Sequence, residues 1–76
     1  MIAKRKTTLI DAIHADAYEW LSHHAPRYLD AIEYELASGG TPESIRNTMI
    51  RNVGPERIGL ALRCEQAARY LIALEE

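Results

Sequence analysis

The sequence predicts an all-α fold: a small domain of four helices in which the C-terminal helix is the longest and lies at the centre. Apolar residues recur at three- and four-residue spacings along most of the chain, and no alternating strand pattern appears. Pro26, the pair Gly39–Gly40 and the pair Gly54–Pro55 separate these periodic segments. Seventy-six residues have room for one core, so we expect positions 1–76 to form a single domain.

The chain opens with Lys4, Arg5 and Lys6, so residues 1–6 are expected to form a flexible basic tail. Thr8 then resembles a helix N-cap, with Asp11 three residues later in a capping-box-like pattern. A first helix is predicted from here to the end of the His23–His24 pair. Its expected inner face contains Ile10, Ile13, Ala17, Trp20, Leu21 and His24.

Pro26 disfavours helical geometry at the preceding residue, which predicts a break and a second helix that starts at the proline. A single kinked helix is the alternative, because the junction contains no glycine. The second helix is predicted to run to about Ser38, and Gly39 fits the left-handed position that follows a helix. Its core-facing residues are expected to be Tyr28, Leu29, Ile32 and Leu36.

The third helix has the clearest start signal in the chain. Thr41 is a good N-cap, Pro42 suits the first helical position, and Glu43 favours the positive end of the helix dipole. This helix is predicted over residues 42–53 and should end at Gly54. Its inward residues are expected to be Ile45, Met49, Ile50 and Val53.

The last helix is predicted from Pro55 to Glu76 and carries two rows of mainly apolar residues. We call Ile58, Ala61, Glu65, Ala68 and Ile72 the isoleucine row, and Leu60, Cys64, Ala67, Leu71 and Leu74 the leucine row. The three shorter helices are expected to cover the isoleucine row, but each offers only one modest stripe. The leucine row is therefore predicted to be a seam for self-association or for a partner.

Two residues of this helix have specific expected roles. Cys64 is the single cysteine, which excludes an internal disulfide, and its place in an apolar row predicts a small buried hydrophobic residue. Glu65 lies on an otherwise apolar face, and a buried charge needs a partner. We expect it to pair with an arginine or with His14.

Composition and charge limit the functional classes. Hydrophobic residues make up 47% and charged residues 26%, the formal net charge is −2, and no run reaches the length of a membrane span. The start lacks the apolar region of a signal peptide, so a cytoplasmic protein with no membrane association is expected. Acidic residues dominate up to Glu43 and arginines dominate from Arg46 to Arg69. This pattern predicts complementary helices that pair within the fold or across a dimer.

A helix-turn-helix interpretation of residues 35–54 is the alternative that gives the arginines another use. The exposed side of helix 42–53 would then present Arg46, Asn47, Arg51 and Asn52. Arginine and asparagine can recognise the edges of guanine and adenine through two hydrogen bonds. On this interpretation the protein would be a nucleic-acid-binding regulator.

The pairs Asp11/His14 and Glu19/His23 place a carboxylate and an imidazole one turn apart, but a metal site in a bundle needs several converging pairs. No phosphate-binding glycine loop or nucleophile–base spacing appears, so no cofactor, metal or catalytic activity is expected. Tyr34 and Tyr70 lie off the main stripes and are candidate interface aromatics. The sequence thus favours a non-enzymatic interaction module (an adaptor, regulator or inhibitor) that forms a homodimer and binds an unidentified protein.

Overall fold

The computed structural model describes residues 8–75 of the chain, with side chains over residues 12–75. Over the described range the chain forms four α-helices: α1 (Thr8–His24), α2 (Pro26–Ala37), α3 (Pro42–Val53) and α4 (Ile58–Glu75). A short 3₁₀ helix, η2 (Pro55–Arg57), joins α3 to α4. The predicted all-α fold with a long C-terminal helix is confirmed. The basic residues 1–6 and the proposed capping side chains of Thr8 and Asp11 lie outside the described part.

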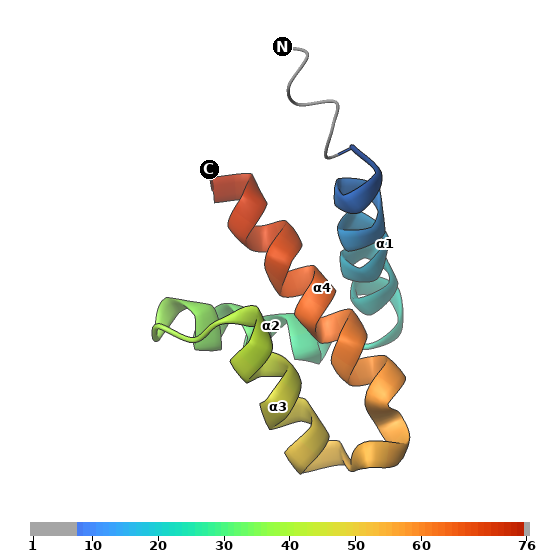
Figure 1. The fold of residues 1–76 in the computed structure, drawn as a ribbon, viewed down its shortest axis with the longest axis vertical. Coiled ribbons are helices and arrows are strands. Elements are labelled where there is room, and N and C mark those ends of the chain that lie inside the picture. The colour runs from blue at the N-terminus through green and yellow to red at the C-terminus, as the bar shows by residue number, and fades with distance from the viewer. Residues whose placement is uncertain (1–7, 76) are drawn as a thin grey trace.

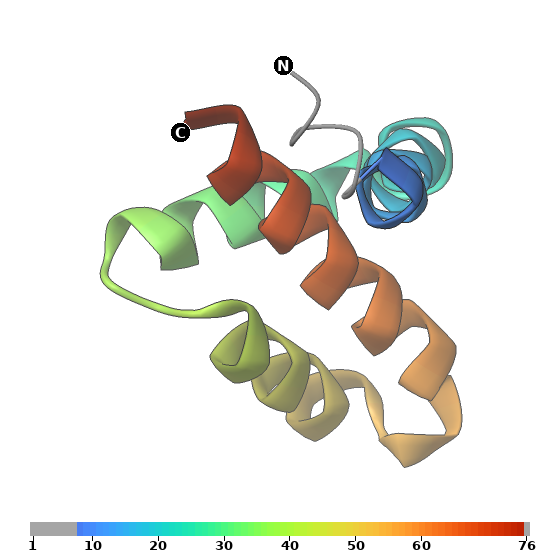
Figure 2. The ribbon, with the colours of Figure 1, turned by 45° about the horizontal axis from the view of Figure 1, so that its top comes forward.

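Helix α4 lies between α1 on one side and α3 on the other, and α2 passes across it (Figures 1 and 2). Helices α1 and α4 run in opposite directions, so the start of α1 and the end of α4 lie at the same end of the molecule (Figure 1). The last turns of α4 extend beyond α2 and α3 in this view. The candidate functional site lies at this end of α4.

Pro26 separates α1 from α2, so the two are distinct helices rather than one kinked helix. Ala25 has φ −152°, an extended value that suits a residue before proline. Its N–H still donates to the carbonyl oxygen of Leu21 at 2.8 Å and completes the last turn of α1.

The turn between α2 and α3 combines two glycines with a capping box. Gly39 has φ +96°, as the sequence predicted for the residue after the helix. A Cβ at Gly40 would lie 2.9 Å from the carbonyl oxygen of Glu35, so only glycine fits there. Thr41 caps α3 as predicted: its Oγ1 accepts from the N–H of Ser44 at 3.1 Å, and Ser44 Oγ accepts from the N–H of Thr41 at 2.9 Å.

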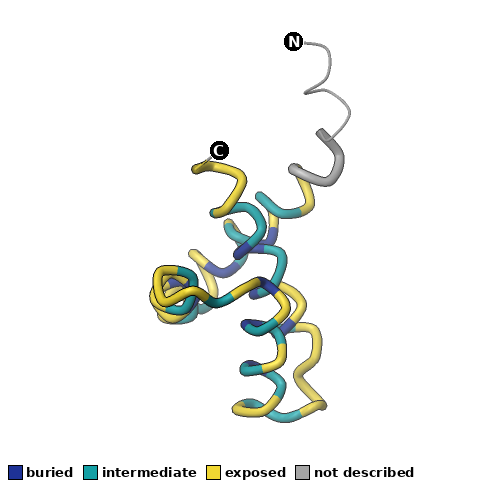
Figure 3. Tube along the Cα trace, turned by 60° about the vertical axis from the view of Figure 1, so that its left-hand side comes forward, coloured by how far each residue is buried: buried dark blue, intermediate teal, exposed yellow. Residues whose placement is uncertain are grey.

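The core forms where the three shorter helices meet α4. Its fully buried large side chains are Leu21 of α1 and Ile32 of α2, and α3 contributes Ile45 and Met49. The buried face of α4 is made of small residues, namely Ala61, Cys64, Ala67 and Ala68. Small side chains let neighbouring helices approach closely, which explains how one helix can be covered on two sides. Figure 3 shows the end of α4 exposed beyond this core.

The packing stripe of α1 differs from the predicted one. Ala17 and Leu21 are buried as expected, but Ile13 is 47% exposed and His24 is exposed. The buried side of α1 is turned toward Tyr18, which packs against Tyr70 of α4 with 5.2 Å between ring centroids. The buried side of α1 is thus rotated about the helix axis relative to the predicted stripe. Ile13 and His24 lie on the edge of that stripe away from Tyr18, so they are exposed.

Candidate functional site

The leucine row of α4 does not behave as one surface. Cys64 and Ala67 have no exposed area, and Leu60 and Leu71 are half-buried against the core. Leu74 is 63% exposed. The prediction that the whole row forms a seam is therefore corrected: α1 packs along α4 and covers the middle of the row within one chain. The most exposed residue of the row is Leu74 at its C-terminal end, and Leu60 and Leu71 are partly exposed.

The isoleucine row was expected to be core throughout, and only its middle is. Ala61 and Ala68 are buried, whereas Ile58 at the start of α4 is 50% exposed and Ile72 is 36% exposed. The C-terminal end of α4 extends past α2 and α3 (Figure 1). At the C-terminal end, residues 71–74 are consecutive apolar residues, and Ile72 and Leu74, two positions apart, are exposed on different sides of the helix.

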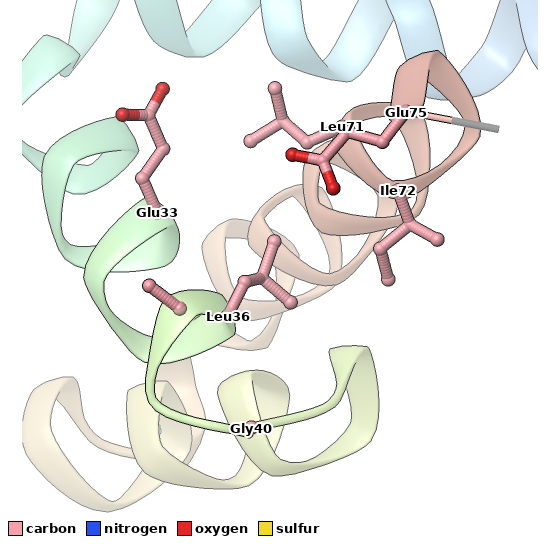
Figure 4. A pocket seen from close by; sticks show the side chains of 7 residues that line it. Glu33, Leu36, Gly40, Leu71, Ile72 and Glu75 are labelled. Atoms are coloured by element: carbon pink, nitrogen blue, oxygen red, sulfur yellow. The ribbon is translucent and has the colours of Figure 1, made fainter.

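A groove of about 510 Å³ lies between the second half of α2 and this end of α4. Its apolar part is formed by Leu36 from α2 and by Leu71 and Ile72 from α4 (Figure 4). Glu33 of α2 and Glu75 of α4 supply one carboxylate from each side. Ala37 and Gly40 complete the lining.

Sequence reasoning missed this groove. Leu36 and Ile72 were both expected to face the core, but they lie at its margin, where α2 and α4 diverge. The spacing of apolar residues places each one on the correct face of its own helix. No local signal reports how far apart two helices stand at that point.

The charged residues between α3 and α4 form a chain of ion pairs. Glu65, whose side chain is 12% exposed, accepts from Arg46 Nη1 at 3.2 Å and from Arg69 Nη2 at 3.0 Å. Arg69 Nη2 also donates to Glu43 Oε2 at 2.7 Å. The expected pairing of Glu65 with an arginine is confirmed. Hydrogen bonds from Arg69 and from its own backbone lower the pKa of Glu43, and the two carboxylates raise the pKa of Arg69.

This ion-pair chain changes the candidate nucleic-acid face. Arg46 points toward α4 and pairs with Glu65, so it does not lie on the outer side of α3. Asn47 and Arg51 are exposed, whereas Asn52 is exposed beside the groove between α2 and α3. Within the described residues 42–53, a nucleic-acid surface would therefore have one free arginine rather than two.

The two candidate interface tyrosines lie in different environments. Tyr34 is 76% exposed on the outer side of α2, whereas Tyr70 is half-buried against Tyr18. A further aromatic cluster was not predicted: the Trp20 ring stacks on His24 at 4.3 Å, and Arg63 Cζ lies 4.2 Å from the centroid of the Trp20 ring. The four-residue spacing of Trp20 and His24 could have indicated the stack.

The candidate metal-binding pair Glu19 and His23 lies on the surface of α1, whereas the single thiol, Cys64, is buried in α4. Glu19 Oε2 and His23 Nε2 are 3.9 Å apart on the exposed side of α1. Among the side chains of residues 12–75, no three potential ligands of the His, Cys, Asp or Glu type gather in one place. Cys64 is buried as predicted, and burial raises the pKa of its thiol to about 11. A thiol in this environment is protonated at neutral pH and unreactive.

Comparison with protein-family models, with curated proteins and with solved structures gives no match for this chain. Within residues 8–75, none of the helices combines the length and apolar character that crossing a membrane requires.

Proposed function

We propose that this protein is a small non-enzymatic interaction module, an adaptor, regulator or inhibitor, which binds another protein and self-associates as a homodimer. The observation that carries the proposal is the apolar end of α4. Leu74 is exposed outside the groove, and Ile72 and part of Leu71 are exposed within it, although a chain of this size gains most by burying such residues.

Energetics support a role in association. A single core of this size rarely supplies more than about 3–5 kcal/mol, and full burial of one leucine contributes about 1.5–3 kcal/mol. Covering the end of α4 would thus add stability comparable to that of the isolated domain. The other exposed apolar pair on α4, Ile58 and Leu62, lies toward the opposite end of the helix and does not line this groove.

Light scattering coupled to gel filtration at micromolar concentration tests the homodimer. We expect about twice the 8.6 kDa monomer mass for the natural chain and the monomer mass for Leu74→Glu. Leu62→Glu is the matched control, because it places the same charge on an exposed leucine of the same helix. Both variants should keep the helical circular dichroism spectrum.

Several outcomes would count against this assignment. A monomer mass for the natural chain at every concentration rules out the homodimer. Loss of the dimer in Leu62→Glu rather than in Leu74→Glu moves the interface to the other end of α4. For binding to a different protein, chemical cross-linking in cells should give adducts at α4 that disappear in Leu74→Glu and persist in Leu62→Glu.

A nucleic-acid-binding regulator is the second candidate. It is favoured by the capped turn between α2 and α3 and by the exposed polar residues Asn47, Arg51 and Asn52 of α3. Gel retardation of duplex DNA at low salt should then be lost in Arg51→Ala. Arg51 is the residue to change, because Arg46→Ala would also break the ion pair with Glu65. Absence of retardation by the natural chain removes this candidate.

A further inference from the structure

We propose that the groove between α2 and α4 binds a basic peptide segment of a partner protein, with one or two large apolar side chains seated between the helices. This inference rests on the proposed function and specifies the partner's chemistry. The groove, at about 510 Å³, is within the range of sites that enclose a few side chains.

The apolar part of the groove would hold the anchor of such a segment. Leu36 points from α2 toward α4, and Leu71 and Ile72 face it from the other side (Figure 4). Leu36 and Leu71 are already half-buried and Ile72 is 36% exposed, so an inserted aliphatic or aromatic side chain would remove their remaining surface from water. These side chains belong to two packed helices, so little ordering is required on binding.

The charge at the margin selects for a basic partner. Glu33 and Glu75 stand on opposite sides, and the lining contains no lysine, arginine or histidine among the described residues. Neither carboxylate has an ion pair among the described side chains, whereas Glu43 and Glu65 are paired with arginines. Lysine and arginine can lay their apolar stems along Leu36 and Ile72 and reach the carboxylates with their charged ends.

The same charges argue against other occupants. In a symmetric dimer each copy would present the same acidic margin to the other, so like charges would approach across the groove. Nucleic acid and acidic peptides would be repelled for the same reason. A basic segment from a different protein is the occupant that matches both the apolar part and the margin.

Selection from a random twelve-residue peptide display library, with the full-length protein as bait, tests this inference without assuming a partner. We expect the selected peptides to combine two or more lysines or arginines with a large apolar residue. A synthetic copy of the strongest peptide is then titrated by fluorescence anisotropy. An increase from 50 to 500 mM salt should weaken its binding, because exposed charge pairs are screened.

Two variant pairs locate the binding. Glu33→Lys with Glu75→Lys should weaken the peptide by at least about ten-fold, whereas Asp16→Lys with Glu19→Lys, the same charge change on the exposed side of α1, should change it less than about two-fold. For the apolar part, Ile72→Ser should weaken binding and Leu62→Ser, at a similarly exposed position of α4, should not.

The inference is overturned if the selected peptides lack basic residues, or if both charge-reversal pairs weaken them equally. In either case peptide binding would still support the proposed function. If no peptide is selected and Ile72→Ser splits a dimer, a second copy occupies the groove, which overturns the inference alone. If no peptide is selected, the natural chain is monomeric and cross-linking gives no adduct at α4, the proposed function fails as well.

Discussion

Glycine positions show how single residues set the corners of this fold. Gly39 has φ +96° with open space around its Cα, so its requirement is purely conformational. Gly40 has the opposite requirement, since a side chain there would meet Glu35. Gly59 lies in the first turn of α4, where a Cβ would have no neighbour within 4 Å, so neither crowding nor backbone conformation requires glycine there.

Alanine substitutions at two of these positions should have opposite effects. Gly39→Ala is expected to lower the free energy of unfolding by about 1 kcal/mol, because an L-residue is strained at positive φ. Gly59→Ala should raise it by about 0.5–1 kcal/mol, because alanine favours the helix and meets no neighbour. Urea titration followed by circular dichroism measures both. Equal signs for the two variants would contradict the assigned turn geometry.

Between elements, the ion-pair chain of α3 and α4 complements apolar packing. Arg46 and Glu43 come from α3, Glu65 and Arg69 come from α4, and one guanidinium serves two carboxylates. The charge distribution of the sequence predicted complementary pairing, and the Glu43–Arg69 pair joins the acidic segment to the arginine-rich one, whereas the Arg46–Glu65 pair lies within the arginine-rich segment. Solvent screens the partly exposed charges, so these ion pairs add little to stability. Their larger effect is to fix how α3 and α4 are aligned along each other.

The pH dependence of stability should reflect Glu43. The hydrogen bond from Arg69 holds the pKa of Glu43 in the folded chain below the ordinary glutamate value of about 4.5. The stabilisation is therefore fully present above that pH and is lost as pH falls through the folded pKa. Urea midpoints measured from pH 6 to pH 3 should fall less steeply for Glu43→Gln than for the natural chain. Asp30→Asn is the control, since Asp30 has no ion pair within the described structure; an equal change in slope for both variants would remove the role of Glu43.

The whole molecule is organised around the middle of α4, where Cys64 has no exposed area. Leu21, Ile32 and Ile45 from the other three helices belong to the same buried cluster. A reagent can therefore reach the Cys64 sulfur only when helices separate. Because the described helices share this cluster, separation at Cys64 approximates global unfolding.

Thiol labelling should consequently report global stability. At pH 8 the label should react with the folded chain about 10² to 10⁴ times more slowly than with the chain in 6 M guanidinium, given a stability of about 3–5 kcal/mol. The pKa of about 11 also implies that stability is full below the unfolded thiol pKa and decreases as pH rises toward 11, since the folded state retains the proton. Labelling of the native chain at the unfolded rate would contradict a buried Cys64.

Most element boundaries were predictable because their causes are local. The start of the last helix is an exception: it was predicted at Pro55, but residues 55–57 form the 3₁₀ helix η2 and α4 begins at Ile58. Pro26, Gly39 and the pair Thr41–Pro42 act through their own φ angles and nearest hydrogen bonds, and the breaks appear at those residues. The N-cap Thr41 was identified in this way, although its reciprocal partner Ser44 was not. The fold class followed from the same local signals.

The candidate site depended on contacts between residues far apart in the chain. Helical periodicity predicts which residues share a face of α4, but burial depends on how far α1, α2 and α3 extend along it. The extent of these three helices along α4 determines that Cys64 and Ala67 lie in the core and that Leu74 is exposed. It also determines that Leu36 faces Ile72 across a groove. The packing of α3 against α4 likewise brings Arg46 to Glu65, which is 19 residues away in the sequence. Such pairings follow from the packing of whole helices, which no short stretch of sequence encodes.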